Sequence, residues 1–189
     1  MLALVTGASS GIGRDMAREL SRRGYDLIIT ARRRDRLEEL AEKLPTRVRV
    51  IEMDLSRADN CRRLHELTAE EPVDVLINNA GFGVFGAFEE SDLERELEML
   101  DINIRATHML TKLYLRDFLR RGEGMILNVS SSAAFLPGPL LSSYYASKAY
   151  VLRLTEAIHE ELRRKGSAVY IGALCPGPVK TEFDRVAGV

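Results

Sequence analysis

Leu2-Ala3-Leu4-Val5-Thr6-Gly7-Ala8-Ser9-Ser10-Gly11-Ile12-Gly13 is a short apolar run that leads directly into a glycine-rich turn. After this turn, Ile12, Met16, Ala17 and Leu20 recur at helical spacing. A wholly apolar run is typical of a parallel strand that is buried on both faces. The opening stretch therefore predicts a strand, a turn and a helix in immediate succession.

The glycines of this turn are spaced as G-x-x-x-G-x-G. Gly7 permits a tight turn, and the absence of side chains at Gly11 and Gly13 lets a pyrophosphate approach the backbone at a helix N-terminus. A glycine-rich stretch alone could be an ordinary loop, but its place between a strand and a helix favours dinucleotide binding. The residues expected to contact a dinucleotide here are Gly7, Ser9, Ser10, Gly11, Ile12 and Gly13.

The end of the next apolar run indicates which dinucleotide is bound. Residues 26–30 read as a second strand, and Ala31, Arg32 and Arg33 follow it. An acidic residue at this place would bind the ribose 2′-hydroxyl of NAD, whereas an arginine suits the 2′-phosphate of NADP. We therefore expect Arg32 and Arg33 to favour NADP(H) over NAD(H). The alternative is a solvated run of charge that opens the following helix.

Strands and helices alternate along the remaining chain. Further strands are expected at 48–51, 73–77, 125–129 and 168–174, and further helices at 35–43, 57–69, 93–119 and from 143 onward. Leu64 and Leu67 are expected on the buried face of the helix at 57–69. Six strands alternating with five helices predict a Rossmann-like, doubly wound α/β fold with a parallel sheet between two helical layers. We expect a single domain that spans residues 1–189.

Polar residues stand out at three further places. Asn78-Asn79-Ala80-Gly81 follows a predicted strand, at the sheet edge where open α/β folds bind ligands. Asn103 lies inside a predicted helix, where asparagine is unfavourable, so it has either a structural polar contact or a catalytic or water-holding role. Tyr144 and Lys148 lie four residues apart on one helix face. A neighbouring ammonium lowers the pKa of a phenol, which would suit Tyr144 to acid–base catalysis; a solvated helix face is the alternative.

The overall composition narrows the class of protein. The formal net charge of -1 gives no reason to expect a nucleic acid or an anionic membrane as partner. No apolar stretch approaches the roughly 18 residues of a membrane span, and a strand beginning at Leu2 leaves no room for a signal peptide. We therefore expect a cytoplasmic protein. Cys61 and Cys175 are far apart and the histidines are isolated, so no metal site is expected.

Taken together, these segments resemble the short-chain dehydrogenase/reductase family, in order and over nearly the whole chain. The glycine turn, the Asn78–Gly81 segment and the closing Pro176-Gly177 with Val179 and Thr181 resemble three of its motifs. The resemblance implies a catalytic set of Asn103, Ser131, Tyr144 and Lys148. Ser131 stands at the family's distance from Tyr144, and Ser130 and Ser132 rank below it. The resemblance also adds cofactor contacts at Asp54 (near the adenine), Leu55, Asn79, Ala80, Gly81, Tyr144, Lys148, Pro176, Gly177, Val179 and Thr181.

Membership of this family would imply an NADP-dependent oxidoreductase that moves a hydride between the nicotinamide and a carbonyl or secondary alcohol. Tyr144 would exchange a proton with the substrate oxygen, and Ser131 would hydrogen-bond that oxygen. Lys148 would lower the pKa of Tyr144 and bind the nicotinamide ribose, while Asn103 would hold a water molecule. The alternative is a non-catalytic NADP-binding regulatory protein on the same fold.

The substrate and the assembly are less closely indicated. The family usually continues with a mobile lid, a helix and a seventh strand; either the molecule lacks these elements or this sequence omits them. The expected pocket walls are apolar and favour an apolar small molecule, although core packing is the alternative for some of them: Phe82, Val84, Phe85, Phe88, Phe135, Leu136, Leu140 and Leu141. The helix from 143 carries two apolar stripes. These stripes and the family both indicate a homodimer or homotetramer.

Overall fold

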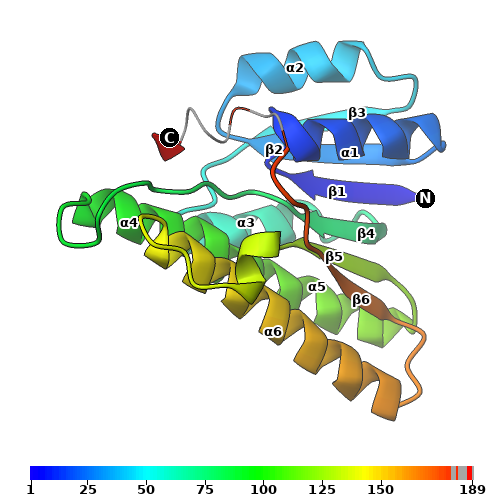
Figure 1. Ribbon diagram of the computed structural model, residues 1–189. Helices are drawn as coiled ribbons and strands as arrows, with labels where there is room; N and C mark the ends of the chain where they lie inside the picture. The colour runs from blue at the N-terminus through cyan, green and yellow to red at the C-terminus, as the bar shows by residue number, and fades with distance from the viewer. Residues whose placement is uncertain (180–181, 183–186, 189) are drawn as a thin grey trace.

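Six parallel strands form one sheet through the centre of the molecule (Figure 1). The computed structural model describes residues 1–179, 182 and 187–188. The strands are β1 (Leu2–Thr6), β2 (Asp26–Ala31), β3 (Val48–Glu52), β4 (Val73–Asn78), β5 (Met125–Val129) and β6 (Tyr170–Leu174). Their order is β3-β2-β1-β4-β5-β6, so the direction of winding reverses between β1 and β4. Ligands of doubly wound folds bind at such a switch point.

Helices lie on both faces of this sheet (Figure 1). They are α1 (Gly11–Arg22), α2 (Arg34–Glu42), α3 (Ala58–Leu67), α4 (Leu93–Leu100), the π-helical turn η1 (Asp101–Ala106), α5 (Thr107–Arg121), the 3-10 helix η2 (Ser132–Phe135) and α6 (Ser142–Arg164). The predicted Rossmann-like, three-layer α/β/α fold is confirmed, and each predicted strand lies within two residues of its expected bounds. Within the described part of the chain, no helix has the length and apolar character of a membrane span.

The core consists of two apolar layers because successive side chains of a strand point to opposite faces. On β1, Ala3 and Val5 pack in the layer of α1 and α2, whereas Leu4 packs in the layer of α3 to α6. All three side chains are fully buried. Burying a side chain of the size of Leu4 or Val5 contributes about 1.5–3 kcal/mol. The apolar runs of the sequence were therefore a reliable guide to the strands.

Two helical predictions differ from the structure. Leu67 is 41% exposed, so its predicted burial is wrong. It is the last residue of α3, and Thr68 takes the buried place beside Leu64 with a 2.6 Å hydrogen bond between its hydroxyl and that of Tyr114. The single helix expected at 93–119 is divided by η1, which contains Asn103. Short π-helical turns of this kind are frequent at functional sites.

The turn after β1 is a close approach of three chain segments. Gly7 has a φ of +66°, which favours glycine. A Cβ atom on Gly13 would lie 2.3 Å from the side-chain nitrogen of Asn79 and 2.5 Å from the carbonyl oxygen of Gly7. Neither distance is possible for a real Cβ. Gly13 therefore allows α1 to begin directly against the turn and the end of β4.

We predict that Gly13→Ala destabilises the protein by about 1–3 kcal/mol, the usual cost of overpacking. Alanine favours a helix over glycine by about 1 kcal/mol at most, so the clash outweighs this gain. The free energy of unfolding in urea measures the effect. Gly177→Ala is the control, because a Cβ there meets no atom within 4 Å. Equal stability of the two variants would contradict the close approach.

Candidate active site

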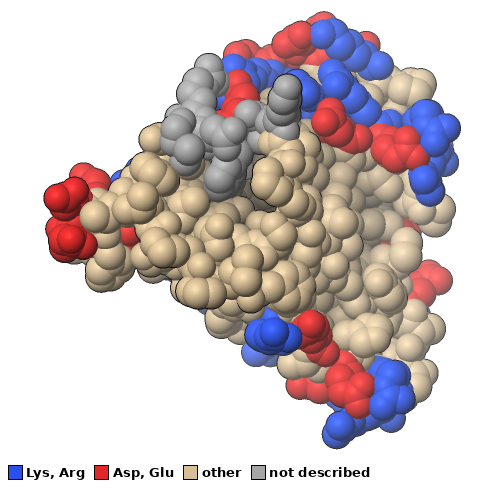
Figure 2. All heavy atoms as spheres, viewed as in Figure 1, with Lys and Arg blue, Asp and Glu red and all other residues tan. Residues whose placement is uncertain are grey.

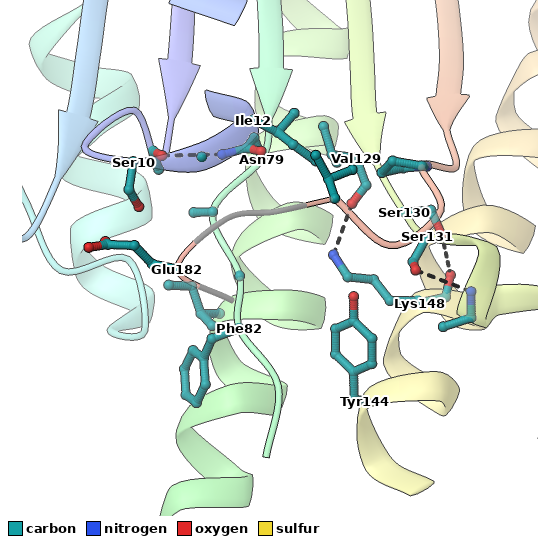
Figure 3. Close-up of a pocket in the computed structure, with 18 of the residues that line it drawn as sticks. Ser10, Ile12, Asn79, Phe82, Val129, Ser130, Ser131, Tyr144, Lys148 and Glu182 are labelled. Carbon is teal, nitrogen blue, oxygen red and sulfur yellow. Dashed lines mark hydrogen bonds between the residues drawn. The ribbon is translucent and has the colours of Figure 1, made fainter. Parts of the chain in front are cut away.

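A cavity of about 490 Å³ lies at the carboxyl ends of the strands, beside the switch point. It extends from the glycine turn to Tyr144 and Lys148 of α6 (Figure 3). The predicted site residues that line it are Gly7, Ser9, Ser10, Gly11, Ile12, Arg32, Arg33, Leu55, Asn79, Ala80, Gly81, Ser131, Tyr144, Lys148, Pro176, Gly177 and Val179. Gly13, Asp54 and Asn103 are not among the lining residues, and Thr181 lies outside the described residues.

Hydrogen bonds fasten the glycine turn to the end of β4. The hydroxyl oxygen of Thr6 accepts from the backbone N–H groups of Asn79 (2.9 Å) and Ala80 (3.0 Å). The side-chain amide of Asn79 donates back to the carbonyl oxygens of Thr6 (3.0 Å) and Gly7 (3.2 Å). The Asn79 amide therefore holds the turn in place at the wall of the cavity.

Asp54 follows β3 but forms a local turn. Its carboxylate accepts from the backbone N–H (3.1 Å) and the hydroxyl (2.8 Å) of Ser56. Its neighbours Met53 and Leu55 line the cavity instead. An adenine contact by Asp54 remains a prediction.

The two adjacent arginines after β2 diverge. Arg33 donates to the hydroxyl oxygens of Ser9 (3.2 Å) and Ser10 (2.9 Å), so its guanidinium lies on the glycine turn. Arg32 donates to Glu98 of α4 at 2.6 Å. The structure thus brings Arg33, rather than the pair, next to the expected phosphate-binding backbone.

Asn103 is buried and fully engaged with the protein. Its side-chain oxygen accepts from the backbone N–H of Phe82 (3.1 Å). Its amide donates to the Phe82 carbonyl (2.9 Å) and to the hydroxyl of Ser147 (3.0 Å). Asn103 therefore ties the loop after β4 to α6, which is the structural contact left open as one alternative. The water-holding role stays a prediction.

The side-chain hydroxyls of Ser131 and Tyr144 lie together at one end of the cavity. The Tyr144 hydroxyl is hydrogen-bonded to Ser131, whose side-chain oxygen also accepts from the backbone N–H of Ala133 (3.1 Å). Ser130 is different, because its hydroxyl is buried and donates to the carbonyl of Lys148 at 2.7 Å. Ser131, and not Ser130, thus lies within hydrogen-bonding reach of the Tyr144 hydroxyl.

Lys148 places a buried ammonium beside Tyr144. Its side-chain nitrogen donates to the Val129 carbonyl at 3.0 Å and lies 5.8 Å from the centre of the Tyr144 ring. Burial lowers the pKa of Lys148 to about 8. Burial also raises the pKa of Tyr144, although its hydrogen bond with Ser131 acts in the opposite direction. The net lowering of the Tyr144 pKa expected from the sequence is therefore wrong for this structure, because burial has the largest effect on that pKa.

Only part of the predicted apolar wall faces the cavity. Phe82 and Leu141 line it, and Phe82 is covered by the guanidinium of Arg95, 4.2 Å from the ring centre. Five others are exposed at the surface: Phe85, Phe88, Phe135, Leu136 and Leu140. Figure 2 shows a broad region without charged residues on this face, between the charged surfaces of α1–α2 and of the end of α6. No three His, Cys, Asp or Glu side chains in the described ranges are grouped to hold a metal ion.

Sequence comparison places this fold and site in a known class. The family model for short chain dehydrogenases matches residues 1–188. The chain therefore belongs to the short-chain dehydrogenase/reductase family. Among curated proteins it is similar to 11-beta-hydroxysteroid dehydrogenase 1A of Arabidopsis thaliana, with 39% identity over 97% of this chain and 54% of that protein. It is 32% identical to the human very-long-chain 3-oxoacyl-CoA reductase, over 97% of this chain and 61% of that protein.

Solved structures of the same family match the fold over its full length. A short-chain dehydrogenase from Sphingobium yanoikuyae in complex with NADPH is 33% identical, with a TM-score of 0.92 over 100% of this chain and 75% of that one. A family member from Burkholderia phymatum in complex with NAD is 28% identical, with a TM-score of 0.93 over 100% of this chain and 69% of that one. The present chain spans between about half and two thirds of the curated relatives named above.

We predict that the buried Lys148 makes stability rise with pH. Its folded pKa of about 8 lies below the value of roughly 10.4 for an exposed lysine. Between these values the unfolded chain binds more protons, so the free energy of unfolding increases with pH. Relative to Lys148→Met, the native chain should gain about 2 kcal/mol between pH 7.5 and pH 10.

Urea unfolding at the two pH values, without added dinucleotide, measures this gain. Lys112→Met is the matched control, because Lys112 is exposed on α5. The Lys112 variant should keep the pH dependence that the Lys148 variant loses. A parallel response of both variants would show that Lys148 is not desolvated in solution.

Proposed function

We propose that the chain is an oxidoreductase that transfers a hydride between NADP(H) and a carbonyl or secondary alcohol of an apolar small molecule. The observation that carries this proposal is the contact of the Tyr144 and Ser131 hydroxyls beside Lys148, in a cavity that also contains the glycine turn. The names of the relatives support the reaction class, since one is a hydroxysteroid dehydrogenase and another an oxoacyl-CoA reductase.

The residues of the cavity fit a dinucleotide. Gly7 and Gly11 line the cavity at the start of α1 without side chains, as the close approach of a pyrophosphate requires. Arg33 beside Ser9 and Ser10 supports NADP over NAD, because a guanidinium and hydroxyls complement a phosphate. The related structures contain NADPH in one case and NAD in the other. When bound, the nicotinamide would supply or accept the hydride.

The protein's own residues would handle the proton. In reduction, the Tyr144 hydroxyl donates its proton to the substrate oxygen, while Ser131 donates a hydrogen bond to the same atom. Lys148, which has a pKa of about 8, is mostly protonated at neutral pH and stabilises the phenolate that Tyr144 becomes. Asn103 positions the loop after β4 and α6 relative to each other.

The substrate would be apolar, because Phe82 and Leu141 line the cavity. A carbonyl reductase of broad range and a 3-oxoacyl reductase both fit this lining. A non-catalytic NADP-binding regulator is not favoured, because such a protein has no need of the arrangement of Ser131, Tyr144 and Lys148. A cytoplasmic location remains a prediction from the sequence.

Assembly into a homodimer or homotetramer is also part of the proposal. Leu93 and Leu97 on α4 are 65% and 45% exposed, and Tyr150 on α6 is 38% exposed. Apolar side chains on neighbouring helices suit a subunit interface. Light scattering after gel filtration should therefore give at least twice the mass of the chain. A monomer at micromolar concentration would contradict this part of the proposal.

We predict that Tyr144→Phe lowers turnover by at least about 10²-fold, the usual contribution of a positioned acid or base. NADPH affinity should change little, because only one hydroxyl is lost. The assay follows NADPH oxidation over a panel of ketones, aldehydes and 3-oxoacyl thioesters, with NADH in parallel. Tyr145→Phe is the matched control, since this neighbouring side chain packs against Gly138.

The panel also separates the two functions. Turnover by the native chain and the Tyr145 variant, but not by the Tyr144 variant, would support the oxidoreductase. Tight NADPH binding without turnover on any compound would favour the regulator. Undiminished turnover in Tyr144→Phe would contradict the role of this tyrosine as proton donor.

A further inference from the structure

A group of charged side chains from distant parts of the chain meets beside the glycine turn. The carboxylate of Glu182 accepts from Arg33 at 2.9 Å and from Arg36, in the first turn of α2, at 2.9 and 2.8 Å. Arg33 also donates to Ser9 and Ser10, as described above. Two guanidinium groups and two hydroxyls are thus gathered at one corner of the cavity. Arg36 was not among the residues that the sequence indicated.

This corner belongs to the proposed cofactor site. Ser9, Ser10, Arg33 and Glu182 all line the same cavity, and in Figure 3 Ser10 and Glu182 lie together at the end away from Lys148 and Tyr144. Guanidinium groups and hydroxyls are the donors that bind phosphate in proteins. The corner therefore has the donors of an anion site, and the anion that it holds in this structure is the chain's own Glu182.

We propose that Glu182 is a specificity-determining residue, whose carboxylate competes with the 2′-phosphate of NADP(H) for Arg33 and Arg36. This inference rests on the proposed function. It adds a residue that weakens the preference of the protein for NADP(H) over NAD(H). NAD(H) has a hydroxyl in place of the 2′-phosphate and leaves both ion pairs intact. Glu182 therefore lowers the affinity for NADP(H) but not the affinity for NAD(H). The two affinities become more alike as a result.

The charges support competition rather than exclusion. Two guanidinium groups share the single carboxylate of Glu182. The three side chains are 28–38% exposed, and ion pairs of this kind are weak enough to be exchanged. Hydrogen bonds from Arg36 and Arg33 lower the pKa of Glu182 to about 2. The carboxylate consequently stays ionised at any working pH, and the competition is constant.

The neighbouring arginine provides a matched comparison. Arg32 pairs with Glu98 of α4 at 2.6 Å, and Glu98 also accepts from Arg95 at 2.6 Å. Arg32 and Glu98 thus form a second arginine–glutamate pair next to the first, but the hydrogen bond of Arg32 leads to α4 and not to the glycine turn. If Arg32 bound the 2′-phosphate instead, neutralising Glu98 would have the effect that we assign to Glu182.

The experiment measures the dissociation constants of NADPH and NADH by calorimetry, with adenosine 2′,5′-bisphosphate and adenosine 5′-phosphate as fragments. The full chain is compared with Glu182→Gln, Glu98→Gln and Arg36→Gln. Glu182→Gln should tighten NADPH and the bisphosphate by up to about tenfold, the equivalent of two exchangeable ion pairs, and leave NADH unchanged. Arg36→Gln should weaken only the two 2′-phosphorylated ligands, and Glu98→Gln should alter none.

The outcomes distinguish this inference from the proposed function. Equal affinity of the native chain and Glu182→Gln for NADPH overturns the inference but not the proposed function. The same holds if Glu98→Gln, and not Glu182→Gln, binds NADPH more tightly. Weaker binding of NADPH and NADH alike by Glu182→Gln, with a lowered thermal midpoint, would make Glu182 structural and would also overturn it. If the native chain binds neither dinucleotide, the proposed function fails and the inference fails with it.

Discussion

The reciprocal hydrogen bonds between Thr6 and Asn79 are the constraint on which the site depends. They join the carboxyl ends of β1 and β4, where the order of the sheet reverses. At this point the chain leaves the two strands toward opposite faces of the sheet, which opens a crevice between the two connections. The hydrogen bonds hold the two sides of this crevice at fixed positions. Gly13 lets α1 start against this junction. The end of the cavity where we propose that phosphate binds is therefore shaped by the backbone, and Gly13 serves the packing of α1 against this junction.

A buried network of hydrogen bonds holds α6 in position at the end of the cavity that contains Lys148. Asn78 donates to Thr111 of α5 and to Asn128 of β5, and Asn128 donates to Thr155 of α6. These bonds cross the interface between the sheet and two helices, at buried positions where unpaired polar groups would be costly. Since Lys148 lies two helical turns before Thr155 on α6, the network fixes the depth and rotation at which its ammonium enters the cavity. Specific partners thus fix a helix that apolar packing alone could allow to slide.

Much of this arrangement could be predicted from the sequence because it depends on local patterns. Apolar runs predicted the strands, and the position of Arg33 after the second strand predicted its place beside the glycine turn. Ser131, Tyr144 and Lys148 were brought together by the resemblance to the family. The failures are of a different kind. Leu67 has the spacing of a buried residue but lies at a helix end. The buried place there is taken by Thr68, whose hydroxyl is hydrogen-bonded to that of Tyr114. The pKa of Tyr144 was misjudged because spacing reveals the neighbouring charge but not the burial of both groups. Arg36 was missed because its partner Glu182 is distant in sequence and exposed charges follow no period.

The two ends of the cavity differ in how readily they can change. Lys148 and Asn103 are 7% and 1% exposed, so water cannot replace the partners that a substitution removes. The pairs of Glu182 with Arg33 and Arg36 are partly exposed, and each is worth no more than about 1 kcal/mol. Substitution at the proposed cofactor end is therefore expected to shift binding by modest factors without disturbing the fold, whereas substitution at the proposed proton-transfer end should affect folding and chemistry together. Under the proposed function, a scaffold of this kind varies its preference between phosphorylated and unphosphorylated dinucleotides while its reaction stays the same.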